Sequence, residues 1–216
     1  MDFAGALSPD HLSFLLEGFW VTIKVAFISI ILSFLIGGIV GILRYASIPV
    51  VSQVLAVLVE TIRNLPLLLI IFFTYFALPE VGIKLDIIYA AIAALTIFES
   101  AMLSEIIRSG LKSIEKGQIE AARSSGLTYV QTLYHIILPQ ALKRMVPPIV
   151  SQFISLLKDT SLAVIIALPD LMHNAQIVYA QKDVYIIPII VTVALMYFIV
   201  NYGLSLIARR LEIKQA

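Results

Sequence analysis

Two neighbouring charged side chains, Lys158 and Asp159, stand inside a long apolar stretch of the sequence, and Arg63 and Glu99 stand inside two others. An ionisable group at the centre of a bilayer costs at least about 2.5–3.5 kcal/mol, so such a group is a functional candidate by default. Lys158 and Asp159 lie about 14 residues beyond the start of their stretch, which at about 1.5 Å per helical residue is roughly 20 Å into a membrane. Because adjacent helical residues point about 100° apart, each side chain could face a central cavity rather than its neighbour.

These charges are unusual because the chain as a whole is strongly apolar. It has 216 residues, of which 60% are hydrophobic and 13% charged, with a mean hydropathy of +1.00. A soluble domain carries about 25% charged residues, so the composition excludes a disordered chain, a nucleic-acid-binding domain and most soluble enzymes. A transmembrane helix needs roughly 20 apolar residues, which leaves room for about five or six helices and no separate catalytic domain. The sequence therefore predicts an all-α integral membrane protein, and the absence of cysteine excludes disulfides and thiolate metal sites.

Five apolar segments are long enough to cross a bilayer, and we expect them to form a single domain over residues 1–216. They cover approximately residues 19–43, 50–78, 87–107, 145–168 and 185–208. The second segment is interrupted by Glu60, Arg63 and Pro66, whereas the fifth carries no charge. A polar loop, residues 108–144, separates the third segment from the fourth.

The distribution of Lys and Arg predicts the orientation of these segments, because basic residues concentrate in short cytoplasmic loops. With the N-terminus outside, the outer segments hold only two basic residues, Lys84 and Lys182. The cytoplasmic segments then hold ten basic residues, namely Arg44, Arg108, Lys112, Lys116, Arg123, Lys143, Arg144, Arg209, Arg210 and Lys214. We therefore expect the loop 108–144 and the C-terminus to lie in the cytoplasm.

The loop 108–144 contains the signals of two short helices joined by a glycine. Residues 118–125 suit a short helix, and Gly126 suits its left-handed C-terminal cap. Thr128 and Gln131 have the spacing of a capping box, which starts a second helix. That helix reaches Leu138 and meets Pro139, which cannot continue an ordinary helical ladder. We expect a helix–glycine–helix elbow outside the bilayer, although a solvated amphipathic linker would have a similar composition.

The same loop resembles the EAA signature of bacterial ABC-importer permeases. The matching positions are Glu120, Ala121, Ala122, Gly126, Ile136, Leu138 and Pro139, at the spacing of that pattern. The resemblance implies that the elbow is a coupling helix, which docks into a groove on a separate ATP-binding subunit. The residue types agree with this role, because small Ala121, Ala122 and Gly126 on the elbow surface would allow a partner to approach closely. Glu120 and Arg123 could then set the register through charge-assisted hydrogen bonds.

Other stretches resemble the polar amino-acid branch of these permeases, in the same order along the chain. They are residues 60–68, in which Asn64 and Leu65 replace the Gly-Thr of that branch, and residues 104–110, 116–118 and 157–162. Residues 96–100 and 146–152 are most similar to permeases of the glutamine and glutamate type, with arginine, histidine or cystine as competing substrates. The resemblance implies a type I importer (MetI-like) permease fold that crosses a bacterial cell membrane several times.

An amino-acid substrate would give the charges within the spans a common purpose. A zwitterion needs a cation for its carboxylate and an anion for its ammonium, which is the minimum polar site in a low dielectric. We expect Lys158 or Arg63 to receive the carboxylate and Asp159 or Glu99 to receive the ammonium. The candidates for additional hydrogen bonds are Asn64, Ser100 and Ser161. The alternative is that Lys158–Asp159 and Arg63–Glu60 are structural ion pairs between helices.

The resemblance also implies which partners the chain needs. The chain has no Gly-x-x-x-x-Gly-Lys-Ser/Thr stretch, so ATP and Mg²⁺ would belong to separate P-loop ATPase subunits, and this chain would be no enzyme and carry no cofactor. Two permease subunits, identical or homologous, would enclose the path. A substrate-binding protein would deliver the amino acid at the outer face, around residues 79–86 and 169–183. His11, His135 and His173 lack the spacing of metal ligands, so no metal site is expected.

Two functions from other classes remain open at this point. A secondary transporter or channel would use the charges within the spans as an ion relay and would work without ATP. A non-transporting sensor or scaffold would recruit an ATPase but would leave those charges without a role in transport.

Overall fold

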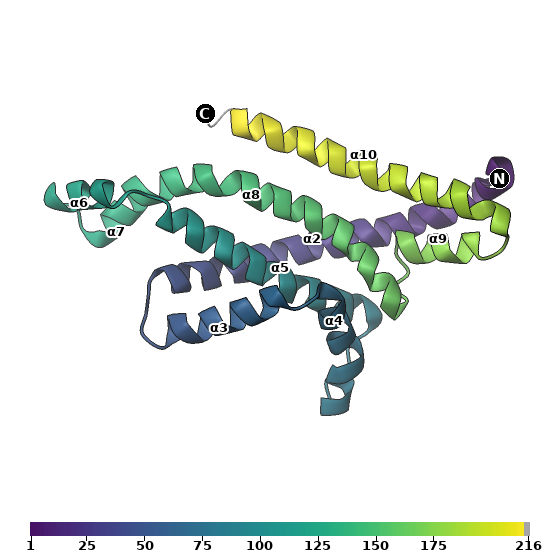
Figure 1. Cartoon of the computed structure of the whole chain (residues 1–216), viewed down its shortest axis with the longest axis horizontal. Helices are drawn as coiled ribbons and strands as arrows, with labels where there is room; N and C mark the ends of the chain where they lie inside the picture. The colour runs from purple at the N-terminus through teal and green to yellow at the C-terminus, as the bar shows by residue number, and fades with distance from the viewer. Residues whose placement is uncertain (214–216) are drawn as a thin grey trace.

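The computed structural model describes residues 1–213, with side chains up to Leu206 and at Ala208, and all regular structure in this part of the chain is helical. Four long helices run along the molecule in Figure 1: α2 (Pro9–Tyr45), α5 (Ile87–Lys112), α8 (Leu138–Asp159) and α10 (Ile186–Ile213). The shorter elements are α1 (Phe3–Ala6), α3 (Val51–Asn64), α4 (Leu67–Phe72), η1 (Phe73–Ala77), η2 (Leu78–Val81), α6 (Lys116–Ser124), α7 (Tyr129–Thr132), η3 (Leu133–Ile137), η4 (Thr160–Ile166), α9 (Leu171–Tyr179) and η5 (Asp183–Tyr185). Of the basic residues that predict the orientation, Lys214 lies outside the described residues, as do the side chains of Arg209 and Arg210.

The helices have the lengths that a membrane protein requires. Within the described residues, four continuous helical stretches are long and apolar enough to cross a bilayer: Pro9–Tyr45, Ile87–Lys112, Tyr129–Ile166 and Asp183–Leu206. The predicted segments 19–43, 87–107, 145–168 and 185–208 overlap these four in turn. The first of these stretches, α2, has 37 residues and extends beyond the predicted 19–43 at both ends. At about 1.5 Å per residue, it is longer than a bilayer is thick.

The second predicted segment, 50–78, is broken in the middle. Helix α3 ends at Asn64, and Val51–Asn64 meets Leu67–Val81 at an angle of 104°. Leu65 and Pro66 between them are extended, with ψ of 142° and 132°. A proline pushes the residue before it out of the helical region, so Pro66 explains why the helix stops there.

Helices α2 and α5 lie against each other at very short range. A Cβ atom added to Gly37 would lie 2.8 Å from the carbonyl oxygen of Ser100, and one added to Gly41 would lie 2.7 Å from that of Ser104. Small residues at these positions let the two backbones approach, which is the usual way for helices to pack where lipid removes the hydrophobic driving force between them. Gly38, which directly follows Gly37, faces open space instead.

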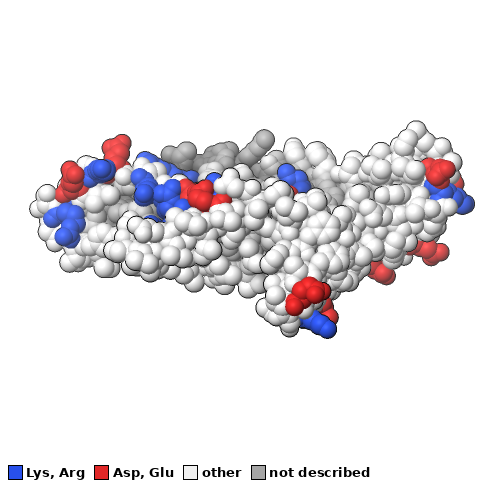
Figure 2. Space-filling view, turned by 60° about the horizontal axis from the view of Figure 1, so that its bottom comes forward, with Lys and Arg blue, Asp and Glu red and all other residues white. Residues whose placement is uncertain are grey.

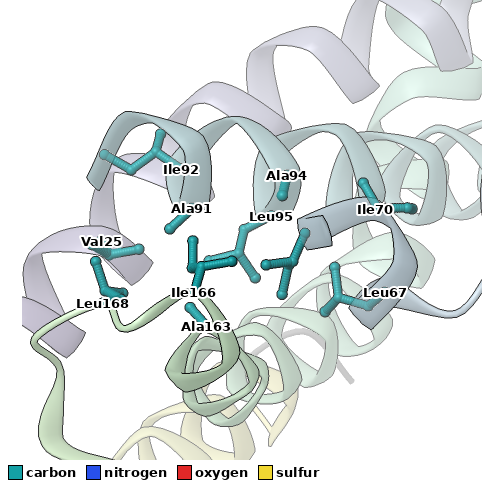
Figure 3. Close-up of a cluster of buried hydrophobic side chains, with 11 residues drawn as sticks. Val25, Leu67, Ile70, Ala91, Ile92, Ala94, Leu95, Ala163, Ile166 and Leu168 are labelled. Carbon is teal, nitrogen blue, oxygen red and sulfur yellow. The ribbon is translucent and has the colours of Figure 1, made fainter. Parts of the chain in front are cut away.

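The bent segment is fixed by a hydrophobic cluster that joins four elements. Figure 3 shows Val25 of α2, Leu67 and Ile70 of α4, Leu95 of α5 and Ile166 of η4 pointing toward one another. Each of these side chains is less than 9% exposed. The cluster therefore holds the C-terminal half of the second predicted segment against α5, although that half leaves the direction of α3.

The contact between α2 and α5 yields a direct test of the packing. Gly37→Ala should destabilise the protein by roughly 1–3 kcal/mol, because the new methyl group overlaps the backbone of α5, and should lower Tm in detergent by about 2–10 °C. Gly38→Ala is the matched control and should leave Tm unchanged or slightly raised, because alanine favours a helix over glycine. Equal Tm values for the two variants would contradict this packing.

Candidate functional site

The polar loop forms a compact elbow made of α6, Gly126 and α7. Gly126 has φ of +87°, and at the end of α6 it donates to the carbonyl of Arg123 at 3.1 Å while Leu127 donates to that of Ala122 at 3.2 Å. This pair of bonds is a Schellman cap. At the start of α7, Thr128 and Gln131 form the predicted capping box, with bonds of 2.8 and 3.2 Å. Because both helix ends are closed by hydrogen bonds, the elbow is a rigid unit.

The sequence predicted that the second helix of the elbow ends at Pro139, but the helix continues past this residue. A π-helical turn, η3, precedes α8, and the helix runs from Tyr129 to Ile166 over 38 residues. A wider turn changes which carbonyl meets the proline ring, so the chain avoids the clash that an α-helical ladder would impose. The elbow is therefore continuous with the fourth predicted span.

The predicted coupling residues differ in exposure. Glu120, Ala121, Arg123, Gly126 and Pro139 are exposed, and Ile136 and Leu138 are half-buried. Ala122 is buried, which corrects the expectation that it lies on the elbow surface.

Two features of the elbow were not predicted. Arg123 donates to the carbonyl of Leu127 at 2.8 Å, so its guanidinium also braces the turn. The second helix of the elbow also carries three exposed apolar side chains, Tyr129, Val130 and Tyr134, of which Val130 is 70% exposed. They were missed because the surrounding loop is polar. Their positions within six residues of one predicted helix were the signal that could have identified them.

A polar centre lies deeper in the molecule, between α5 and α8. Glu99 is 1% exposed, and its Oε2 accepts a hydrogen bond of 3.1 Å from the side-chain amide of Gln152. Its second oxygen, Oε1, has no partner among the described residues. Asp159 is half-buried, close enough to Glu99 for their charges to interact, and on the same face of the helix as Gln152, seven residues earlier. The structure thus brings two predicted residues together and adds Gln152, which sequence reasoning missed.

Lys158, Ser161 and Ser100 are not part of the contact between Glu99 and Gln152. Lys158 is exposed and takes part in none of the ion pairs of the described side chains, so the Lys158–Asp159 pair considered above is not formed. Ser161 donates to the carbonyl of Lys158 at 2.7 Å and lines a cavity of about 230 Å³ with Tyr179 and Tyr197. Ser100, on α5, lines a separate cavity of about 210 Å³ between α2, α3 and α5.

Arg63 and Asn64 belong to a different cluster. Arg63 pairs with Glu60 at 3.3 Å, and the side-chain amide of Asn64 donates to the carbonyl of Glu60 at 2.7 Å, all within α3. The Arg63–Glu60 pair therefore lies within one helix rather than between two. Figure 2 shows a mixed patch of basic and acidic side chains toward the end of the molecule that carries α6 and α7.

The two segments predicted to lie outside, residues 79–86 and 169–183, meet around a cavity of about 530 Å³. Asp86 comes from one segment, Pro169 from the other, and Lys24 of α2 lines the same cavity. Beside it, α9 packs on α2, and its N-cap, Asp170, is fully buried and accepts from the backbone of His173 at 2.8 Å. Burial raises the pKa of Asp170 to about 7. Among the described residues, no group of histidine, aspartate and glutamate side chains could hold a metal ion.

The chain is similar to known proteins over most or all of its length. Residues 30–213 match the family described as "Binding-protein-dependent transport system inner membrane component". A Bacillus subtilis protein described as "Probable glutamine ABC transporter permease protein GlnP" is 74% identical and covers 100% of both chains. Another from the same organism, "Probable glutamine ABC transporter permease protein GlnM", is 41% identical over 94% of both. A solved structure, "Crystal structure of an amino acid ABC transporter with histidines", has a TM-score of 0.92, 29% identity and 99% coverage of both chains.

The buried Asp170 makes stability depend on pH. The raised pKa means that the folded protein holds the proton of Asp170 more tightly than the unfolded chain does. The free energy of unfolding is therefore highest below about pH 4, where both states are protonated, and this stability is lost as pH rises through about 7. Tm in detergent should therefore fall between pH 5 and 7.5. Asp170→Asn keeps an N-cap and should flatten this fall, and an unchanged slope in the variant would contradict the assignment to Asp170.

Proposed function

The chain belongs to the family of binding-protein-dependent transport system inner membrane components, and from this premise we propose that it forms the translocation path of a glutamine importer. Membership makes it a multi-pass inner-membrane permease subunit of an ABC transporter, which is not itself an enzyme and works with an ATPase and a substrate-binding protein. The observation that carries glutamine is the 74% identity, over the full length, to a relative whose name includes that substrate. Arginine, histidine and cystine are the competing substrates.

The polar centre has the chemistry to bind the ammonium group of an amino acid. Glu99 presents a buried oxygen that has no partner in the part of the chain that the structure describes, and Asp159 adds a second acidic group nearby. A buried carboxylate oxygen costs free energy until it is paired, so an ammonium that bridges the two groups would relieve this cost. Gln152 orients Glu99 by its hydrogen bond. Lys158, next to Asp159 in the sequence and in none of the ion pairs of the described residues, would receive the substrate carboxylate, whereas Ser161 and Ser100 line separate cavities.

The elbow would couple this centre to ATP hydrolysis on the partner subunit. Its exposed surface combines the charges of Glu120 and Arg123 with the apolar side chains of Tyr129, Val130 and Tyr134. An apolar anchor inside a charged rim is the usual composition of a specific protein interface. Because one continuous helix joins the elbow to residue 166, a rotation of the elbow would move Gln152 and Asp159 relative to Glu99 on α5. Such a rigid-body switch would open the centre to one side and then to the other.

The assembly would contain two permease subunits, identical or homologous, and two ATPase subunits that hold ATP and Mg²⁺. The N-terminus would lie outside and the C-terminus in the cytoplasm, as the positive-inside rule requires. The binding protein would then dock over the cavity between residues 79–86 and 169–183, which lies at the opposite end of α5 from the elbow.

Asp159→Asn should reduce transport without disrupting the complex. The variant loses one charged partner of the ammonium group, worth about 1.5–3 kcal/mol, so the uptake rate at saturating glutamine and binding protein should fall roughly ten- to hundredfold. Uptake of labelled glutamine into proteoliposomes measures this, with the exposed Asp10→Asn as control. A wild-type rate in Asp159→Asn would assign Asp159 a structural role.

Gly126→Val should uncouple the elbow while the chain still inserts into the membrane. A β-branched residue is strongly disfavoured at φ of +87°, so the Schellman cap should open and ATP-dependent uptake should fall at least about tenfold. Gly117→Val is the matched control, because an added Cβ meets nothing within 4 Å at either position and only Gly126 has a positive φ. Normal uptake by the Gly126 variant would refute the coupling role.

A further inference from the structure

Five charged side chains form a connected network between α2, α3 and α5. Arg44 donates to Glu105 at 2.9 Å and lies 3.9 Å from Glu60, while Arg63 pairs with Glu60 at 3.3 Å. Arg108 completes the network through two bonds to Glu105. Three guanidinium groups thus share two carboxylates, which leaves the network with one positive charge in excess.

Two donors in this network have no acceptor within the described part of the chain. The Nε–H groups of Arg44 and Arg63 are buried and have no hydrogen-bond partner among the described residues, and Arg44 as a whole is 8% exposed. Arginine carries donors only, and a buried donor or charge without a partner is costly. Both the excess charge and the free donors therefore call for an anion with acceptor oxygens.

The network is open on the side of α3. Glu60 is exposed, and Gln53 and Asn64 are exposed on the same face of this helix, at spacings of seven and four residues from Glu60. Polar side chains in a membrane-spanning segment face a water-filled cavity or another protein element rather than lipid. Val57 is also exposed on this face, but the exposed polar groups of Glu60 and Asn64 next to Arg63 are more consistent with an aqueous path than with contact to lipid.

The position of the network along α5 places it beyond the polar centre. Glu105 follows Glu99 by six residues, which is roughly 9 Å along the helix in the direction of the elbow. In the orientation proposed above, this is the cytoplasmic direction. An amino acid that leaves the Glu99–Asp159 centre for the cytoplasm would pass this level next.

We propose that Arg63, held beside Arg44 by their shared partner Glu60, binds the α-carboxylate of the amino acid on its way out and forms a second, exit-side site in the permease. This inference rests on the proposed transport function and deepens it. Arg63 is the accessible member, with its side chain 32% exposed, whereas Arg44 is nearly enclosed. The carboxylate would supply the missing acceptor for the Nε–H of Arg63 and neutralise the excess charge, while Glu60 keeps its pair with Arg63.

The test uses the complete importer in proteoliposomes that contain ATP and different concentrations of unlabelled glutamine. Binding protein and labelled glutamine are added outside, and the initial uptake rate is measured. Internal glutamine should occupy the exit site and slow uptake in the wild type. In Arg63→Gln the internal concentration that halves the rate should be about tenfold higher, because a charge-assisted bond is lost. Arg63→Lys, which keeps the charge, should retain most of the sensitivity.

The controls separate the possible ligands. Lys112→Gln removes a nearby charge that is in none of the network's ion pairs and should behave as wild type. Internal glutaminol, which has an alcohol in place of the carboxylate, should not slow uptake. Equal sensitivity of Arg63→Gln and the wild type, or inhibition by glutaminol, would overturn the exit site. An effect of Arg63→Gln that appears only in vesicles containing phosphatidylglycerol would overturn it in favour of a lipid phosphate.

The proposed function fails in a different way. If the wild-type importer takes up no labelled glutamine, both the glutamine assignment and the exit site are overturned. If uptake proceeds and depends on Asp159, but internal glutamine has no effect in any variant, only the exit site is overturned.

Discussion

The close contact of α2 with α5 positions the groups on which transport would depend. Gly37 and Gly41 let the two backbones approach, and the carbonyls that they meet belong to Ser100 and Ser104. Glu99, on the same turns of α5, is thereby held at a fixed place in the interior. Further along α5, Arg44 of α2 reaches Glu105. The interior of a membrane-spanning chain offers little water to charged groups, so the packing stabilises Arg44 and Glu105 by bringing them together.

Against this fixed pair of helices, the long helix from Tyr129 to Ile166 is the element best suited to move. Its first part, α7, is the second helix of the elbow, and its last part carries Gln152 and Asp159. The Schellman cap and the capping box make the elbow stiff, so a displacement there would be transmitted rather than absorbed. The interface between α5 and this helix contains Glu99 and its partners, and a small shift would change which oxygens are available to a substrate.

Local signals in the sequence predicted local structure well. The capping box of Thr128 and Gln131 formed as expected, because its bonds join residues three apart and depend on little else. Pro66 marked a break, but the 104° bend depends on the cluster around Leu67, which periodicity does not reveal. The prediction that the helix ends at Pro139 was wrong, because a π-helical turn accommodates the proline.

Contacts between distant residues could not be predicted in this way. The bond between Glu99 and Gln152 joins residues 53 apart in sequence, and the connection from Arg44 to Glu105 joins residues 61 apart. Ala122 is buried where α6 packs against α7 and η3, and this tertiary packing cannot be read from the local sequence.

The most direct test of the account is ATP-dependent accumulation by the purified complex in proteoliposomes. With its ATPase, ATP and a binding protein, the permease should concentrate labelled glutamine above the outside level, and without ATP it should not. Excess arginine, histidine or cystine should leave the rate unchanged. Equilibration of glutamine without ATP would contradict the coupling of this permease to ATP hydrolysis, and accumulation of another amino acid in place of glutamine would contradict its substrate.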